Sequence, residues 1–258
     1  MTDRVHFVLI RGLLRDARHW GDFTDALQQR FPHSLISTPD VPGNGRLCHA
    51  VSPTTIAAMT DALRGQIMAS YPLTLIGLSM GGMIAIDWMC RYPNEVEAAV
   101  LINTSVKPLS PFYQRLYWMA YPRLFRMIVH APVKRESDIL NLTSNYHQQD
   151  GQLLRNWQSW QRQCPVSTVS AKNQFLAAVK FSLPVNKPRQ SILVVTSTAD
   201  RLVDYHCSLK LSQAWQTDYL QHDTAGHDLP LDEPEWLACV IARWFNHHCL
   251  ANLAITCN

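Results

Sequence analysis

A lone serine lies between two glycines, at the point where an apolar run ends and a helical pattern begins. The apolar run Leu73–Ile76 stops at Gly77, and a helical pattern begins directly after Gly81. Ser79 lies between the two glycines in the spacing Gly-x-Ser-x-Gly. A chain that passes from a buried strand to a helix through so sharp a turn needs these glycines, because side chains there would collide. We therefore expect the Ser79 hydroxyl to project from the edge of a sheet.

Short apolar runs and helical patterns alternate along most of the chain. Strands are predicted at His6–Ile10, Ser34–Ser37, Leu73–Ile76, Ala98–Ile102, Gln190–Ser197 and Asp218–Gln221. Helices are predicted at His19–Phe31, after an N-cap at Ser52, at Gly81–Arg91, near Cys207–Trp215 and at Glu233–His247. Strands that alternate with helices in this way predict a parallel sheet with helices on both faces.

The alternation stops between residues 106 and 187, where the sequence gives no strand signal. Helical patterns rich in aromatic residues and arginine occupy this stretch, at Phe112–Tyr121, Leu153–Gln163 and Asn173–Phe181. We interpret residues 106–187 as a helical cap, or lid. It is inserted into an α/β core formed by residues 1–105 and 188–258.

Length and composition exclude several classes of protein. The 258 residues are 47% hydrophobic, enough for one large domain with an insertion. A formal net charge of +3, without runs of like charge, argues against a nucleic-acid partner. No apolar run suits a membrane span, and the N-terminal residues lack the core of a signal peptide. The seven cysteines form no Cys-x-x-Cys pair, which favours reduced thiols in a cytoplasmic protein.

A serine nucleophile needs a base, and the base needs an orienting carboxylate. Asp200 follows one predicted strand and His227 follows the last one, so both lie at carboxyl ends, where α/β sheets place their chemistry. Asp204 is the nearest rival for the acid. Asp223 and Asp228 flank the histidine and are interpreted as local turn residues. Other late histidines are His206, His222, His247 and His248, but His227 is preferred because it follows Ala-Gly after the last strand.

Gly77–Gly81, Asp200 and Gly226-His227, in this order, resemble the α/β-hydrolase superfamily. The resemblance implies an α/β-hydrolase fold with Ser79, His227 and Asp200 as a catalytic triad. It also implies an oxyanion hole made by the backbone amides of Met80 and Leu13.

Arg11-Gly12 stands where the superfamily usually has His-Gly before the second oxyanion amide. The usual histidine supports the loop by hydrogen bonding, a role that arginine can fill, although arginine also adds a cation near the site. The turn Asp40–Gly45 resembles another family motif and is interpreted as structural.

The superfamily's sheet normally begins with an antiparallel pair of strands, for which this chain has no room before His6. About six strands are therefore expected, all parallel, with the strand near Leu35 as an exposed edge.

The resemblance predicts a serine hydrolase that cleaves a small carboxylic ester or thioester. Neither a metal nor an organic cofactor is expected, because no ligand cluster has the spacing of a metal site. A carbon–carbon bond hydrolase or the lyase of menaquinone synthesis would use the same triad, and a non-catalytic binding module would keep only the fold. That lyase has an arginine one helical turn after its serine, and the matching residue here is Met83. Members with an aspartate nucleophile are disfavoured by Ser79.

Aromatic residues crowd the first part of the cap. Phe112, Tyr113, Tyr117 and Trp118 are candidates for the wall of an acyl pocket, and Tyr121, Phe125 and Met127 lie beside them. Arg115, Arg123 and Arg126 among them are interpreted as a solvated face or as a cationic rim for an acidic substrate. The resemblance to the carrier-protein methyl esterase of biotin synthesis makes an acyl-carrier protein an alternative partner. The oligomeric state is left open.

Overall fold

Six parallel strands form one sheet in the computed structural model, which describes residues 5–68, 72–122 and 132–250. The strands are β1 His6–Ile10, β2 Leu35–Ser37, β3 Leu73–Leu78, β4 Val96–Ile102, β5 Ser191–Ser197 and β6 Asp218–His222. They lie in the order β2-β1-β3-β4-β5-β6, and every neighbouring pair is parallel. The predicted parallel sheet of about six strands is confirmed. So is the exposed edge at β2, where 46% of Leu35 is accessible.

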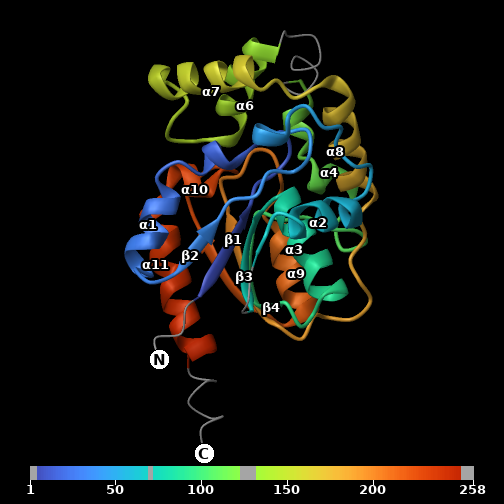
Figure 1. Ribbon diagram of the computed structural model, residues 1–258, viewed down its shortest axis with the longest axis vertical. Helices are drawn as coiled ribbons and strands as arrows, with labels where there is room; N and C mark the ends of the chain where they lie inside the picture. Colours follow the sequence, from blue (N-terminus) through green and yellow to red (C-terminus); the bar gives the residue numbers. More distant parts are fainter. Residues whose placement is uncertain (1–4, 69–71, 123–131, 251–258) are drawn as a thin grey trace, which may run out of the picture.

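Helices cover both faces of the sheet (Figure 1). One face carries α1 and α11, and the other carries α2, α3 and α9. Their bounds are α1 Phe23–Arg30, α2 Ile56–Arg64, α3 Met80–Arg91, α9 His206–Trp215, α10 Leu229–Asp232 and α11 Pro234–Phe245. Short turns of helix lie at η1 Ala17–Trp20, η2 Gly45–Leu47 and η4 Asn246–Leu250.

The two layers of core follow from the two-residue alternation of side chains along a strand. In β1, Phe7 and Leu9 face the cluster that includes α1 and α11, whereas Val8 and Ile10 face the cluster with α2, α3 and α9. Because both faces of the central strands are buried, these strands are mostly apolar, as expected for a parallel sheet. The carboxyl ends of the strands are thereby held in fixed positions along one edge of the sheet.

The helices between β4 and β5 lie over the carboxyl ends of the strands or beside them (Figure 1). They are α4 Phe112–Arg115, η3 Trp118–Ala120, α6 Pro132–Thr143, α7 Gly151–Gln163 and α8 Thr168–Lys180. A bridge between Lys107 and Ser182 brings the two ends of this insertion together. The helical insertion is confirmed, while its limits as a separate cap, residues 106–187, stay a prediction.

Two local expectations are wrong, and one helix was not expected. The single helix expected over Phe112–Tyr121 breaks into α4 and η3, because Leu116 is extended, and α6 was not expected at all. Helix α2 is capped by Thr55, whose hydroxyl accepts a hydrogen bond from the amide of Ala58. Ser52 does not cap it, because the helix begins at Ile56, four residues later, and the Ser52 hydroxyl instead donates to the Pro42 carbonyl at 2.5 Å.

The turn Asp40–Gly45 has the structural role expected of it. The buried Asp40 carboxylate accepts hydrogen bonds from the amides of Ala17 and Arg46, at 2.8 and 3.0 Å. Gly45 has a φ of +48°, and a Cβ there would come 2.5 Å from Asp40 Oδ2. The turn thus fixes the loop that follows β1.

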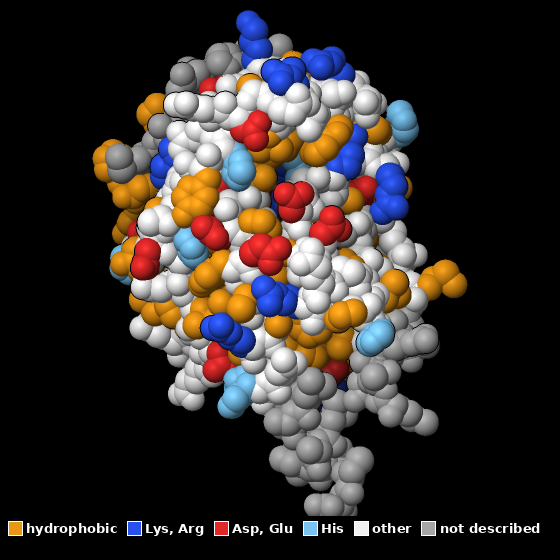
Figure 2. All heavy atoms as spheres, turned by 90° about the vertical axis from the view of Figure 1, so that its left-hand side faces the viewer, with side chains coloured by type: hydrophobic (Ala, Val, Ile, Leu, Met, Phe, Trp, Pro, Cys, Tyr) orange, Lys and Arg blue, Asp and Glu red, His pale blue; other side chains and the backbone are white. Residues whose placement is uncertain are grey.

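The surface beside α1 and α11 carries side chains of both charges (Figure 2). Acidic groups gather towards the middle of this face, with lysine and arginine above and below them. Within the described residues, no helix is both long and apolar enough to cross a membrane.

Candidate active site

The turn between β3 and α3 holds Ser79 in a strained conformation, with φ 58° and ψ −116°. A Cβ on Gly77 would lie 2.5 Å from the carbonyl oxygen of Gly81, and one on Gly81 would lie 2.0 Å from that of Ile10. Both glycines are therefore required by close backbone contacts, as the Gly-x-Ser-x-Gly spacing predicts. Backbone strain of this kind is concentrated at functional sites, because the surrounding structure must hold it in place.

His227 and Asp200 form a buried hydrogen bond between His227 Nδ1 and Asp200 Oδ2, at 2.6 Å. The amides of Leu202 and Val203 donate to the other carboxylate oxygen, Oδ1, at 2.7 and 3.0 Å. Three donors thus hold the Asp200 carboxylate in one orientation. With its Nδ1 proton bound to Asp200, the imidazole leaves Nε2 as an acceptor for a hydroxyl proton.

The rival acid, Asp204, has a different set of partners. Its carboxylate accepts from the amide of His206 at 3.0 Å and contacts Nδ1 of the same residue at 2.7 Å. These contacts place Asp204 at the start of α9, where it satisfies a free amide of the first turn. Asp200, by contrast, lies directly against His227.

The loop after β1 lies over Ser79. A Cβ on Gly12 would come 3.3 Å from Cβ and 3.9 Å from Oγ of Ser79. The next residues, Leu13 and Leu14, therefore pass close to the serine, and the amide of Met80 belongs to the first turn of α3. These positions agree with an oxyanion hole at Leu13 and Met80, whose role stays a prediction.

Gln174 of α8 supports the same loop, although no local sequence pattern marks this residue. Its side-chain oxygen accepts from the amide of Leu14 at 2.9 Å, and its side-chain nitrogen donates to Asn44 and Ser52. Leu14 has a φ of +61°, a conformation that a leucine adopts only when its surroundings impose it. The fully buried Gln174 thus ties the insertion to the proposed oxyanion loop.

Arg11 pairs with Asp228, so the interpretation of Asp228 as a local turn residue is wrong. Arg11 Nη1 donates to Oδ1 at 3.0 Å and Nη2 donates to Oδ2 at 2.6 Å. Both side chains are 4% exposed. Burial alone would raise the pKa of Asp228, but the charge and hydrogen bonds of Arg11 hold that pKa below its usual value. The cation of Arg11 is therefore balanced inside the protein.

Asn103, directly after β4, is a further site residue that motif analysis missed. Its side-chain nitrogen donates to the carbonyl of His227 at 2.8 Å, and its oxygen accepts from the amide of Ser197 at 2.8 Å. Asn103 has a φ of +47°, which asparagine tolerates better than most residues. Like Ser79 and Asp200, Asn103 follows a strand at its carboxyl end. This position, which the sequence shows, is the signal that could have identified it as a site residue.

The C-terminal end of α6 packs on both the acid and the histidine loops. A Cβ on Gly226 would lie 2.5 Å from the carbonyl of Thr143, which accepts from the amide of Asp228 at 2.8 Å. Arg201 donates to the carbonyls of Asn141 and Ser144 at 2.6 and 2.7 Å. The glycine before His227 is therefore needed because α6 approaches so closely.

A second buried pair joins the loop after β1 to the insertion. Arg15 Nη1 donates to Glu136 Oε2 at 2.7 Å, and the Arg15 guanidinium lies 4.5 Å from the centre of the Trp157 ring. The ring of His19 sits between Trp157 and Trp160, with ring centres 5.2 and 5.1 Å away. Burial and the charge of Arg15 lower the pKa of His19 to about 4, so this imidazole is neutral near pH 7.

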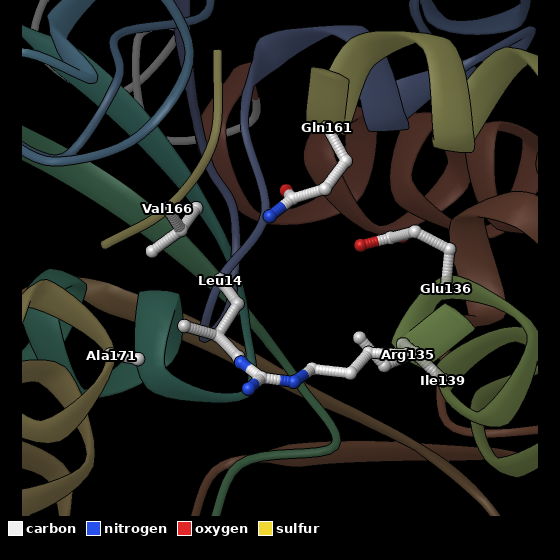
Figure 3. A pocket seen from close by; sticks show the side chains of 7 residues that line it. All are labelled: Leu14, Arg135, Glu136, Ile139, Gln161, Val166 and Ala171. Atoms are coloured by element: carbon white, nitrogen blue, oxygen red, sulfur yellow. The ribbon is translucent and has the colours of Figure 1, made fainter. Parts of the chain in front are cut away.

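A cavity lies between the proposed oxyanion loop and the insertion (Figure 3). Its lining combines polar and apolar side chains: Leu14, Arg135, Glu136, Ile139, Gln161, Val166 and Ala171. Arg135 extends along one side of the cavity towards Leu14, and Gln161 points in from α7 (Figure 3). The lining therefore includes a cation, an anion and an amide beside the loop that lies over Ser79.

The four candidate pocket aromatics are not among the residues that line this cavity. Phe112, Tyr113 and Trp118 are exposed, Trp118 to 60%, and Tyr117 is half-buried. Their role as an acyl-pocket wall stays a prediction. Phe125, Met127, Arg123 and Arg126 lie outside the described residues.

Arg115 does not form part of a solvated face. Its guanidinium donates to the carbonyls of Ala178 and Val179 at 2.8 and 3.3 Å, and burial lowers its pKa. Across the described ranges, no group of three or more histidine, cysteine or acidic residues is arranged to hold a metal ion.

Comparisons with known proteins place these features in context. A family model described as serine aminopeptidase, S33, matches residues 54–233. The pimeloyl-[acyl-carrier protein] methyl ester esterase of Chromobacterium violaceum is 32% identical over 89 residues, which is 34% of this chain and 33% of that protein. Lipase LipV of Mycobacterium tuberculosis is 31% identical over 99 residues, 38% of this chain and 36% of the lipase. The matched part thus spans about a third of these curated relatives.

Solved structures share the fold at low sequence identity. The enol-lactonase from Burkholderia xenovorans LB400 has a TM-score of 0.74 and 19% identity, covering 95% of this chain and 92% of that one. A hydrolase from Pseudomonas aeruginosa has a TM-score of 0.75 and 14% identity, covering 95% and 91%.

The glycine contacts at the Ser79 turn lead to a test of the fold. Gly81→Ala puts a Cβ 2.0 Å from a backbone oxygen that cannot move away, whereas Gly65→Ala meets only ordinary contacts at 3.7 Å. We expect Gly81→Ala to lower the free energy of unfolding by about 3 kcal/mol or more, and Gly65→Ala to change it by under about 1 kcal/mol. Urea denaturation measures both, and equal effects would contradict the steric argument.

Proposed function

This chain belongs to the family described as serine aminopeptidase, S33, within the α/β-hydrolase superfamily, and we propose that it is a serine hydrolase of small carboxylic esters or thioesters. Ser79 is the nucleophile, His227 the base and Asp200 the acid that orients it. The observation that carries the proposal is the 2.6 Å hydrogen bond between His227 and Asp200, at the same edge of the parallel sheet as a serine held on a strained turn.

The proposed reaction has two halves. Ser79 Oγ attacks the carbonyl carbon as His227 Nε2 takes the hydroxyl proton, and the amides of Leu13 and Met80 bind the developing oxyanion. Collapse of the tetrahedral intermediate expels the alcohol or thiol, which receives the proton from His227, and leaves an acyl-enzyme. A water molecule then attacks the acyl carbon with His227 again as base, which releases the acid and restores Ser79.

Two alternatives fit the contacts less well. A lyase that binds an acidic substrate through an arginine one turn after the serine finds Met83 there, buried in the core. A binding module without catalysis would have no use for the φ of +58° at Ser79, since such strain costs about 1–3 kcal/mol. Both arguments favour hydrolysis.

The cavity of Figure 3 marks a candidate position for the acyl chain, because its lining mixes apolar and polar side chains. Leu14, Ile139 and Val166 supply apolar surface, while Arg135, Gln161 and Glu136, the last paired with Arg15, supply charges and hydrogen-bonding groups. An acyl chain that ends in a carboxylate or an ester would satisfy both kinds of surface. The name of the Chromobacterium violaceum relative, a pimeloyl methyl ester esterase, supports this class of substrate, and it keeps an acyl-carrier protein as an alternative partner. We place the enzyme in the cytoplasm.

The first test concerns the nucleophile. We expect wild-type protein to react with a fluorophosphonate probe at Ser79 and to hydrolyse short 4-nitrophenyl esters. Ser79→Ala should lose labelling and at least about three orders of magnitude in turnover, with an unchanged melting temperature, because a small, partly exposed hydroxyl is removed. Retention of more than roughly a tenth of the rate would rule out Ser79. Amino-acid amides belong in the same substrate panel, since hydrolysis of amides alone would indicate a peptidase.

A matched pair of variants tests the acid. Asp200→Asn removes the carboxylate that holds the imidazole, so turnover should fall by roughly 10³- to 10⁴-fold. Asp204→Asn removes a contact at the start of α9 and should leave turnover within about twofold while lowering stability by about 1 kcal/mol. Steady-state kinetics and thermal melting separate the two effects. The assignment fails when Asp204→Asn is the more damaging change for turnover.

The substrate pocket has two candidate walls, and one experiment distinguishes them. Ala171→Leu adds bulk inside the cavity beside the proposed oxyanion loop, so long acyl chains should lose at least about fivefold in kcat/KM relative to acetyl. Trp118→Ala changes the exposed aromatic segment instead. A series of esters of increasing acyl length measures both rankings. If only Trp118→Ala alters the ranking, the aromatic segment is the acyl wall and the cavity is not.

A further inference from the structure

We propose that Arg11 and Asp228 are a positioning pair, which sets the oxyanion loop and the histidine loop in the arrangement that the reaction needs. The proposal rests on the proposed function, because it assigns these residues a role in the turnover of Ser79. Neither residue touches the reacting atoms. Each acts through its neighbour in the chain: Arg11 through the Gly12–Leu13 loop, and Asp228 through His227.

The geometry of the pair supports a role in alignment. Two parallel hydrogen bonds, at 3.0 and 2.6 Å, fix both the distance and the plane of the guanidinium against the carboxylate. The Arg11 guanidinium also lies 4.9 Å from the centre of the Trp20 ring. The pair therefore joins segments 217 residues apart through one rigid, bidentate contact. Loss of this contact would release the Arg11 side chain, and with it the Gly12–Leu13 loop that lies over Ser79.

The backbone of Asp228 is held as firmly as its side chain. Its amide donates to the Thr143 carbonyl at 2.8 Å, and its carbonyl accepts from the amides of Leu231 and Asp232 at 3.0 Å. The carbonyl of the preceding His227 accepts from Asn103. With the backbone fixed on both sides of the imidazole, the side chain of Asp228 is free to hold Arg11 in place.

The charges of Arg11 and Asp228 also affect His227. Charged groups of four segments lie against His227 or against the residues beside it: Asp200 and Arg201 after β5, Arg11 and Arg15 after β1, Asp228 itself, and Asp232 of α10, whose carboxylate accepts from the amide of Gly226. Arg11 and Asp228 offset one another, so the pair adds neither a net cation nor a net anion beside the imidazole. Loss of one partner leaves the other charge buried and unbalanced beside the base.

A purely structural role predicts something different. A buried ion pair often contributes little net stability, because desolvation offsets the attraction between its charges. If the pair only held the fold together, its removal would lower the melting temperature and the amount of active enzyme. It would not change the shape of the pH–rate profile.

The test uses three variants of the full chain: Arg11→Gln, Asp228→Asn and the double variant. Asp228→Asn leaves the Arg11 cation unpaired, which disfavours the protonated imidazole and should move the acid limb of kcat/KM to lower pH by roughly 0.5–1 unit. Arg11→Gln leaves the Asp228 anion unpaired and should move the limb to higher pH by a similar amount. The double variant should restore the wild-type limb. Each single variant should lose at least about tenfold in kcat with KM within about threefold, and the double variant should lose less than the product of the two.

A remote pair provides the control. Arg64 and Glu95 form a bidentate pair at the opposite end of the strands, so Arg64→Gln and Glu95→Gln should affect melting but not the pH profile. Unchanged acid limbs in both single variants of the proposed pair, or shifts in the same direction, would overturn the proposal. Additive losses in the double variant would also overturn it.

Two further measurements keep every outcome decisive. If Asp228→Asn does not fold, Arg11→Lys takes its place in the test. Lysine keeps the positive charge but cannot make the two parallel hydrogen bonds of the guanidinium. It should therefore lower kcat by several-fold and leave the acid limb of the kcat/KM profile where it is. Histidine NMR follows the titration midpoint of the His227 ring without any substrate. Opposite midpoint shifts in the two single variants support the pair even if wild-type protein fails to label at Ser79, a result that would reject only the proposed function.

Discussion

The close contact between two backbones determines most of this site. Helix α3 begins so near to β1 that a Cβ on Gly81 would lie 2.0 Å from the carbonyl oxygen of Ile10. This approach forces the turn at Ser79 into its strained conformation and brings the loop after Ile10 over the serine. The proposed nucleophile and the proposed oxyanion loop are thus set by one steric contact, which exists only because β1 and β3 are neighbours in the sheet.

The remaining groups reach the site through the same parallel geometry. Ser79, Asn103, Asp200 and His227 each follow a different strand, and parallel strands deliver their carboxyl ends to one edge. Hydrogen bonds between these loops then replace the regular ladder of the sheet. Asn103 follows β4 and bonds to Ser197, the last residue of β5, and to His227, which follows β6. One side chain thus joins the ends of three strands.

The sequence predicts the parts of this arrangement that depend on local spacing. The sheet, its exposed edge and the positions of Ser79, Asp200 and His227 all follow from short patterns at strand ends. The pairing of Arg11 with Asp228 does not, because no local pattern links residues 217 positions apart. For the same reason Gln174 and Glu136 gave no signal. Helix propensity also gave a wrong prediction over Phe112–Tyr121, where tertiary contacts break the expected helix into α4 and η3.

The attachment of α6 has a mechanical consequence. Its last turn contacts the loops that carry both Asp200 and His227, through Arg201, Gly226 and Asp228. A movement of the insertion that displaced this turn would pull His227 away from Asp200. The last turn of α6 is therefore part of the frame that holds the proposed acid and base, and a substrate of the proposed enzyme must enter by a route that leaves α6 in place. Any evolution of a wider entrance would have to remodel the other helices of the insertion and leave this anchor in place.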